Sequence, residues 1–146
     1  MSNYSKGVIS IPDVTGNIVI TVTTEGQAVN LFNPSTASYN QRLNSSGVLK
    51  PGNGIVVTDT IDVRNLNTLT VSGITEIKSS GYGYYAAMCA YSDPAGTTIS
   101  GSISLYTNEQ YTFDVSTASY VRLSFVLKDN VAISTADTAN LTIYGS

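Results

Sequence analysis

The sequence has no histidine, no tryptophan and a single cysteine, Cys89. Without histidine the chain can form neither a Ser–His–Asp triad nor a Cys–His pair, and one cysteine forms no disulfide within the chain. A zinc site built from histidine and cysteine ligands is excluded for the same reason. We therefore expect no cofactor, no bound metal and no catalysis of these kinds.

Charged residues are also scarce, at 12% of the 146 positions, and ten acidic residues outweigh seven basic ones to give a net charge of −3. A nucleic-acid-binding protein needs a basic face to displace counterions from phosphates, so we expect no nucleic-acid partner. The chain has no run of about 18 apolar residues, the length that a membrane span needs. Met1–Lys6 lacks the apolar stretch of a signal peptide, and we expect a protein made in a cytoplasm that enters no membrane.

The residues that are present are typical of a folded β protein. Serine and threonine make up roughly a quarter of the chain, ten residues are tyrosine, and hydrophobic residues reach 42%. Disordered chains are poor in aromatic and β-branched residues, and a chain of this length buries about 70% of its extended surface. No long window has the i, i+3, i+4 pattern of an amphipathic helix, and turn signals recur every ~8–12 residues. We predict an all-β fold, an antiparallel β-sandwich.

The alternation of apolar and polar residues predicts individual strands. These are Ile55–Val63, a strand that starts at Thr68, Tyr82–Tyr91, Thr98–Ser104, Tyr111–Val115, Val121–Leu127 and Leu141–Ile143. Ile74 is out of phase with Leu69 and Val71, which predicts a β-bulge at Gly73. Ser35–Asn44 and Lys50–Gly54 are rich in turn residues and are predicted to be a loop and a turn.

The N-terminal part has a pattern of its own. Residues 7–24 predict two strands around a turn at Pro12–Asn17, and so a β-hairpin. An isolated hairpin is marginally stable in water, so it must pack on the rest of the chain or on another subunit. The predicted division is an N-terminal β-hairpin or anchoring arm, residues 1–26, followed by the β-sandwich, residues 27–146. We expect the arm to pair its strands with another subunit.

A series of short motifs runs through the predicted sandwich. They are Asn30–Pro34, Asn44–Leu49, Val57–Val63, Tyr85–Asp93, Tyr111–Val115 and Ser119–Ser124. In their order and spacing, residues 30–145 resemble the jelly-roll modules, similar to carbohydrate-binding modules, of bacteriophage tail fibres, baseplate appendages and minor structural proteins. The chain departs from that pattern at Tyr91-Ser92-Asp93, where a serine separates the tyrosine from the aspartate, and in having no tryptophan.

The resemblance implies a jelly-roll sandwich in a virion protein made in the bacterial host. On this basis we expect a non-catalytic structural protein, a capsid decoration or a tail-associated module, that presents the sandwich on the particle surface. Its expected partners are other virion subunits, through residues 1–26, and copies of itself, because symmetric assembly is the usual form of oligomers. The alternative is a glycan-binding adhesion module, of a tail fibre or a bacterial surface protein, that contacts a host cell-surface glycan.

The candidate glycan-binding residues are Tyr82, Tyr84, Arg122 and Tyr39. Tyrosine rings stack on the apolar C–H face of a sugar, and glycines on either side of Tyr82 leave its neighbourhood open. Arg122, on the outward phase of its strand, can donate paired hydrogen bonds to hydroxyls or to the carboxylate of an acidic sugar. Each residue has a structural alternative: the tyrosines as ordinary sheet residues, and Arg122 as a solvated side chain or an ion-pair partner of Asp59, Asp62 or Asp114.

The carboxylates do not predict an enzyme. Asp59 and Asp62 are the closest pair, but a spacing of three places them on opposite faces of a strand, whereas a glycosidase needs two carboxylates that face one bond. A polysaccharide depolymerase, the third function considered, would also need a positioned acid–base pair with shifted pKa values. We therefore expect no enzymatic activity.

Overall fold

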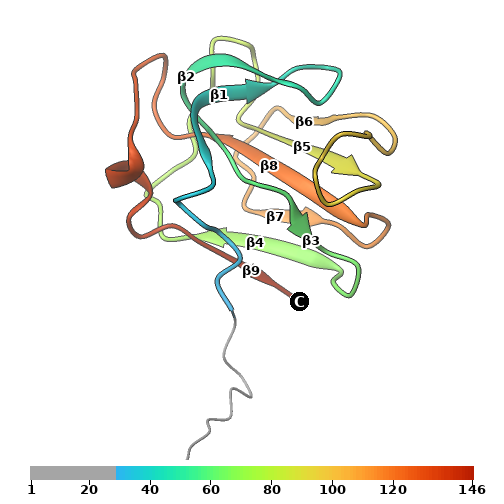
Figure 1. Cartoon of the computed structure of the whole chain (residues 1–146). Helices are drawn as coiled ribbons and strands as arrows, with labels where there is room; N and C mark the ends of the chain where they lie inside the picture. The colour runs from blue at the N-terminus through green and yellow to red at the C-terminus, as the bar shows by residue number, and fades with distance from the viewer. Residues whose placement is uncertain (1–28) are drawn as a thin grey trace, which may run out of the picture.

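The computed structural model describes residues 29–146, which form two antiparallel β-sheets packed face to face (Figure 1). The predicted N-terminal hairpin or anchoring arm, residues 1–26, lies outside the described residues. The elements are β1 Ser38–Leu43, β2 Leu49–Val57, β3 Ile61–Asp62, β4 Thr68–Ser72, β5 Ala86–Tyr91, β6 Ser104–Tyr106, β7 Thr112–Asp114, β8 Tyr120–Val126, the 3₁₀ turn η1 Thr135–Thr138 and β9 Thr142–Gly145. Within residues 29–146, no helix is long and apolar enough to cross a membrane. The predicted all-β sandwich is confirmed.

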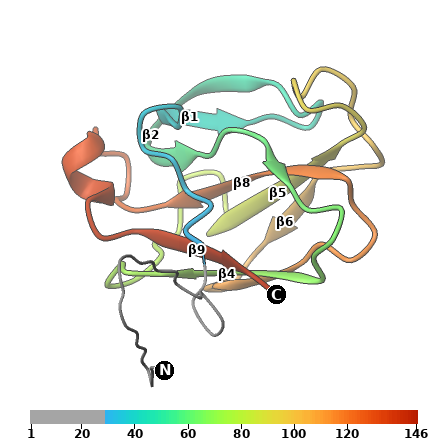
Figure 2. The ribbon, with the colours of Figure 1, turned by 60° about the horizontal axis from the view of Figure 1, so that its bottom comes forward.

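The larger sheet has the order β1-β2-β8-β5-β6, with β3 also paired to β8, and the smaller sheet has the order β7-β4-β9. Figure 2 shows β4 and β9 as a layer on one side of β5 and β8, with β1 and β2 on the other side. The N–H of Leu31 donates to the carbonyl of Ile143 at 2.8 Å, and the N–H of Ile143 donates to Asn30 Oδ1 at 3.0 Å. The first described residues therefore lie along the outer edge of β9.

The core between the two sheets follows from strand periodicity. Leu123 and Phe125 of β8 are fully buried, as are Leu69 and Val71 of β4, and all four belong to one hydrophobic cluster. Thr70, which alternates with the β4 pair, is exposed. Alternate residues of a strand face opposite sides, so one apolar set from each sheet fills the space between them.

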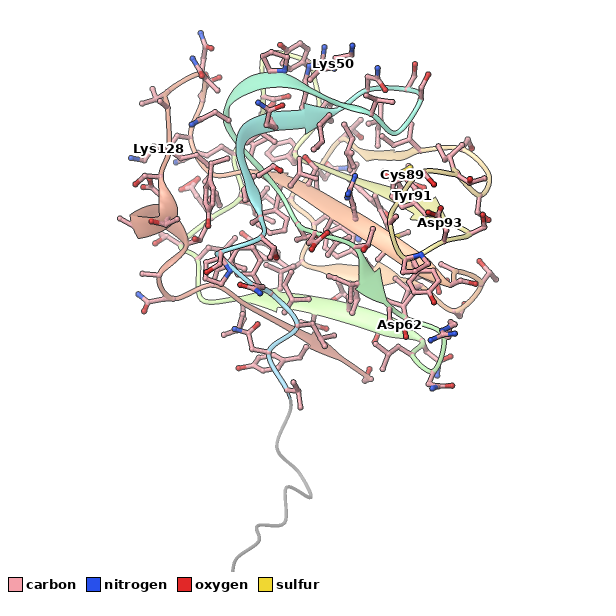
Figure 3. The ribbon with its side chains drawn as sticks, in the orientation of Figure 1. Lys50, Asp62, Cys89, Tyr91, Asp93 and Lys128 are labelled. Carbon is pink, nitrogen blue, oxygen red and sulfur yellow. The ribbon has the colours of Figure 1, made fainter. Side chains whose placement is uncertain are left out.

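The outer face of the larger sheet carries a second, smaller cluster made of Leu43, Val57, Cys89 and Tyr91. The turn after β1 folds over this cluster, where the Tyr91 hydroxyl donates to the carbonyl of Gly47 at 2.8 Å. Gly47 has a φ of 71°, and a Cβ there would lie 2.7 Å from Cys89 Sγ, so only glycine fits. Figure 3 shows Cys89 and Tyr91 close together on β5. The β1–β2 hairpin is thereby held against the outer face.

Two segments predicted as a loop and a turn are strands instead. Ser35–Asn44 contains all of β1, and Lys50–Gly54 lies within β2. Pro51 pairs with Gln41 of β1, whereas β2 pairs with β8 only over residues 55–57. A proline is tolerated where one edge of a strand has no partner, because its missing N–H then breaks no ladder. The turn residues misled the strand prediction because this part of β2 is paired with β1 along one edge and is not paired with β8 along the other.

Several predicted boundaries also differ from the structure. Ile55–Val63 is divided into β2 and β3, β5 begins at Ala86 rather than at Tyr82, and the weak strand Thr98–Ser104 is replaced by β6. At Gly73, β4 has already ended; φ is 84°, and a Cβ there would lie 1.7 Å from the carbonyl oxygen of Asn140. This glycine therefore marks a close approach of two backbones, not a bulge within a strand.

Candidate functional site

A groove lies on the outer face of the larger sheet, where β1, β6 and the connection between β4 and β5 meet. We call it the Tyr82 groove; its volume is about 220 Å³. The lining is mainly apolar and consists of Arg42, Leu43, Asn44, Ser45, Tyr82, Tyr84, Ile103 and Leu105. Two aromatic rings and one charged side chain thus share a small concavity.

A tight turn positions Tyr82 and Tyr84. The N–H of Tyr82 donates to Ser80 Oγ, and the N–H of Gly83 donates to the carbonyl of Ser80, both at 3.1 Å. Gly83 has a φ of 85°, in the left-handed region that favours glycine. The two rings stack with centroids 6.3 Å apart and planes inclined by 28°. Tyr82 is 56% exposed and Tyr84 only 4%, so one ring faces solvent and the other supports it from the interior.

Arg42 of β1 supplies the charge of the groove. Its Cζ lies 4.4 Å from the centroid of the Tyr82 ring, a cation–π distance. Its Nε is buried and has no hydrogen-bond partner among residues 29–146, and the same is true of the Tyr84 hydroxyl. Burial raises the pKa of the Tyr84 hydroxyl, and the positive charge of Arg42 opposes that rise. Buried polar atoms are ordinarily hydrogen-bonded, so these two lack the usual partners, and a ligand in the groove can supply them once the side chains shift.

A second, more polar groove of about 330 Å³ adjoins the first. It is lined by Asn53, Ile55, Ser80, Gly81, Tyr82, Asp129 and Asn130. Tyr82 belongs to both linings, so its ring stands between the two grooves. A ligand longer than one ring can therefore contact apolar surface and Arg42 on one side of Tyr82, and hydroxyl, amide and carboxylate groups on the other.

Of the four predicted site residues, the structure brings Tyr82 and Tyr84 together and places the other two elsewhere. Tyr39 is half-buried on β1, not in a loop, and its hydroxyl lies 2.9 Å from Thr138 Oγ1 and donates to the carbonyl of Pro34 at 3.2 Å. These bonds connect β1 to η1 and occupy the hydroxyl. Tyr39 lines neither of the two grooves at Tyr82.

Arg122 also lies outside both grooves. It is half-buried on the outer face of β8, with its Cζ 5.5 Å from the centroid of the Tyr91 ring. The loop after β5 passes over it, because a Cβ on Gly96 would lie 3.2 Å from the guanidinium. Among residues 29–146 it forms no ion pair with the three aspartates proposed as partners, and one of them, Asp62, pairs with Arg64 at 2.7 Å.

Arg42 is the site residue that the sequence did not predict. Arg42 belongs to the segment that was predicted to be a loop, and in a loop the sequence does not indicate which face of the protein a side chain occupies. Its position depends on β1 being a strand, in which Arg42 is paired with Lys50 of β2. The one available signal was the alternation of Tyr39, Gln41 and Leu43, which is short and contains a polar member.

The aspartates have local structural roles. Asp62 accepts two hydrogen bonds from the Arg64 guanidinium, at 3.0 and 2.7 Å, and these lower the pKa of its carboxyl to about 2. Asp93 accepts from the Thr97 hydroxyl and from the N–H groups of Thr97 and Thr98, which lowers its pKa and closes the loop after β5. Within residues 29–146, no group of three or more Cys, Asp or Glu side chains is placed to hold a metal ion.

Comparisons of this chain with protein-family models, with curated proteins and with solved structures found no match.

Proposed function

We propose that this chain is a non-catalytic module, of jelly-roll type and similar to carbohydrate-binding modules, that is displayed on a bacteriophage virion and binds a glycan through the Tyr82 groove. The observation that carries the proposal is the exposed Tyr82 ring, held in place by stacking against Tyr84 and by the Arg42 guanidinium over the ring. An aromatic ring held in place before binding loses little entropy when a sugar stacks on it. Exposed rings of this kind are a usual surface for the apolar face of a sugar.

The size of the site favours one ring of a longer glycan. Enclosed small-molecule sites have volumes of roughly 300–1,000 Å³. The Tyr82 groove, at about 220 Å³, is smaller, and it opens beside a second groove across Tyr82. We infer that one sugar ring occupies the Tyr82 groove and that its neighbour in the glycan extends over the polar groove.

A binding role suits these grooves better than a catalytic one. Hydrolysis of a glycosidic bond ordinarily needs two carboxylates that face it. Asp129 is the one carboxylate in the linings of the two grooves.

The order of the motifs in residues 30–145, which resembles that of phage jelly-roll modules, supports display on a virion, as a capsid decoration or a tail-associated protein. In this proposal residues 1–26 bind other virion subunits and the module is a homo-oligomer.

The test is binding of the full chain to a glycan array and to immobilised polysaccharides. Tyr82→Ala is expected to weaken binding by about tenfold or more, because the stacking surface is lost. Tyr144→Ala is the matched control, since Tyr144 is a half-buried tyrosine on β9 of the smaller sheet. Absence of binding to every glycan, or equal losses in the two variants, would overturn the proposal.

A further inference from the structure

Arg42 is one of three basic residues, with Lys50 and Arg122, that form no ion pair among residues 29–146. Six of the seven basic residues lie within residues 29–146. Three of the six form ion pairs there, namely Arg64 with Asp62, Lys78 with Glu76 and Lys128 with Asp137. Arg42 has no such partner among the described residues, and it is the one charged side chain in the lining of the Tyr82 groove. The groove therefore carries an uncompensated positive charge in a protein whose net charge is negative.

Lys50 strengthens this positive charge. It is the direct cross-strand partner of Arg42 in the β1–β2 ladder, so the two side chains extend from the same face. Like charges in this position repel each other and destabilise a sheet. Lys50 is exposed and extends from β2 at the edge of the molecule (Figure 3). Together the two cations raise the electrostatic potential at one end of the groove.

The unpartnered atoms of the groove are hydrogen-bond donors. Arg42 Nε carries an N–H and the Tyr84 hydroxyl carries an O–H, and neither buried group has an acceptor within the described part of the chain. Tyr84 itself is 96% buried, so solvent contact does not replace the missing partner. A neutral sugar hydroxyl has two acceptor lone pairs and no charge, whereas an ionised carboxylate has about four and also neutralises the arginine.

From these observations we propose that the Tyr82 groove selects a sugar that carries an ionised carboxylate. The ring stacks on Tyr82, and the carboxylate faces Arg42, accepting hydrogen bonds from its guanidinium and from the Tyr84 hydroxyl after a small side-chain adjustment. The carboxylate lies on the Arg42 side of Tyr82 because Asp129, on the other side, repels it. This inference depends on the proposed function, of which it specifies the ligand class.

The test compares two ligands with the same sugar rings, one with ionised carboxylates and one with neutral methyl esters. The full chain is titrated with oligogalacturonate and with its methyl ester, in which the same sugar rings are neutral. We expect the acid to bind about tenfold or more tightly than the ester, since charge-assisted hydrogen bonds are stronger than neutral ones. The preference is expected to shrink as salt is added, because ions screen exposed charges. A sialylated oligosaccharide, titrated in parallel, distinguishes a uronic acid from another acidic sugar as the preferred source of the carboxylate.

Variants of Arg42 test whether the preference for the acid over the ester depends on this side chain. Arg42→Gln is expected to remove the preference, so that the acid and the ester bind with about equal affinity, and Arg42→Lys is expected to retain part of the preference. Arg64→Gln is the control, because Arg64 also lies over a tyrosine ring, that of Tyr120, at 5.2 Å. Thermal unfolding of each variant confirms that it is folded.

The possible results separate this inference from the proposed function. If acid and ester bind equally, or if Arg42→Gln keeps the preference, the inference is wrong while glycan binding stands. If no sugar ligand, acidic or neutral, binds at all, both the inference and the proposed function fail.

Discussion

The side chain of Asn40 takes the place of a neighbouring strand beside Ile133. Its Oδ1 accepts a hydrogen bond from the Ile133 N–H and its Nδ2 donates one to the Ile133 carbonyl, both at 2.9 Å. Two residues in an antiparallel ladder exchange the same pair of bonds through their backbones. Asn40 Oδ1 also accepts from the N–H of Gly54 at 3.2 Å. One side chain at the bulge of β1 thus connects β1, β2 and the segment before η1.

We expect Asn40→Ala to lower the free energy of unfolding by about 2–4 kcal/mol, because it leaves backbone groups of Ile133 without partners and places alanine at positive φ. The φ of Asn40 is 60°. Asn40→Gly removes the same hydrogen bonds, but glycine tolerates this φ. Its free energy of unfolding should therefore lie between those of Asn40→Ala and the natural protein. Urea unfolding measures the difference. If Asn40→Gly were as stable as the natural protein, the hydrogen bonds to Ile133 would contribute nothing.

Removing the hydroxyl of Tyr91 and removing that of Tyr84 should have different effects on the stability of the protein. Tyr91→Phe deletes a hydroxyl that donates to the carbonyl of Gly47, and it should destabilise the protein by about 1–2 kcal/mol. Tyr84→Phe deletes a hydroxyl that has no partner, and it should leave stability unchanged or slightly raised. Thermal unfolding of both variants under the same conditions tests this. A larger loss for Tyr84→Phe than for Tyr91→Phe would contradict the assigned hydrogen bonding.

Gly73 and Gly83 have almost the same φ, 84° and 85°, in different surroundings. A Cβ on Gly73 would overlap the carbonyl of Asn140, whereas a Cβ on Gly83 would have no atom within 4 Å. We therefore expect Gly83→Ala to cost about 1 kcal/mol from backbone conformation alone, and Gly73→Ala to cost clearly more, because the connection before β9 must move. Denaturant midpoints of the two variants give the comparison. Equal midpoints would show that the space around Gly73 is not as described.

The pKa of Asp62 gives a prediction about pH. Hydrogen bonds from Arg64 lower the pKa of this carboxyl from 3.8 to about 2, so the ionised form favours the folded state. That contribution is fully present above pH 3.8 and is lost as the pH falls through about 2. In Arg64→Ala, the midpoint of Asp62 in an NMR titration should return toward 3.8. The low pKa of Asp114 has its cause in Ser116, so that residue should not respond and serves as the internal control.

The strands that fill the core could be predicted from the sequence because alternation is unambiguous there. Leu123 and Phe125 alternate with Arg122 and Ser124, and all of β8 except its first residue, Tyr120, lies within the segment predicted as a strand. Prediction failed at β1 and at the start of β2, where pairing is on one side only and Asn40 and Pro51 are tolerated within strands. The failure is physical, since the turn residues in these segments are as compatible with an irregular edge as with a loop.

The candidate site could be predicted only in part for a related reason. Tyr82 and Tyr84 were recognisable because they lie two residues apart, among glycines, in one short segment. Arg42 reaches the same groove from forty positions away, through a strand that the sequence did not indicate. Arg122 shares the residue type and the outward phase that suggested a site, but the loop closed by Asp93 covers it. Which arginine stays accessible is decided by loop packing, not by the strand pattern.

The hydrogen bond between Leu31 and Ile143 fixes where the described chain begins relative to the Tyr82 groove. The described chain begins beside β9, at the edge of the smaller sheet (Figure 1), whereas the Tyr82 groove lies on the outer face of the larger sheet. A tag, bead or sensor surface coupled on the N-terminal side of Val29 therefore leaves the groove pointing away from its support. Immobilisation by that end is the orientation in which weak, multivalent capture of a polymer should be easiest to detect.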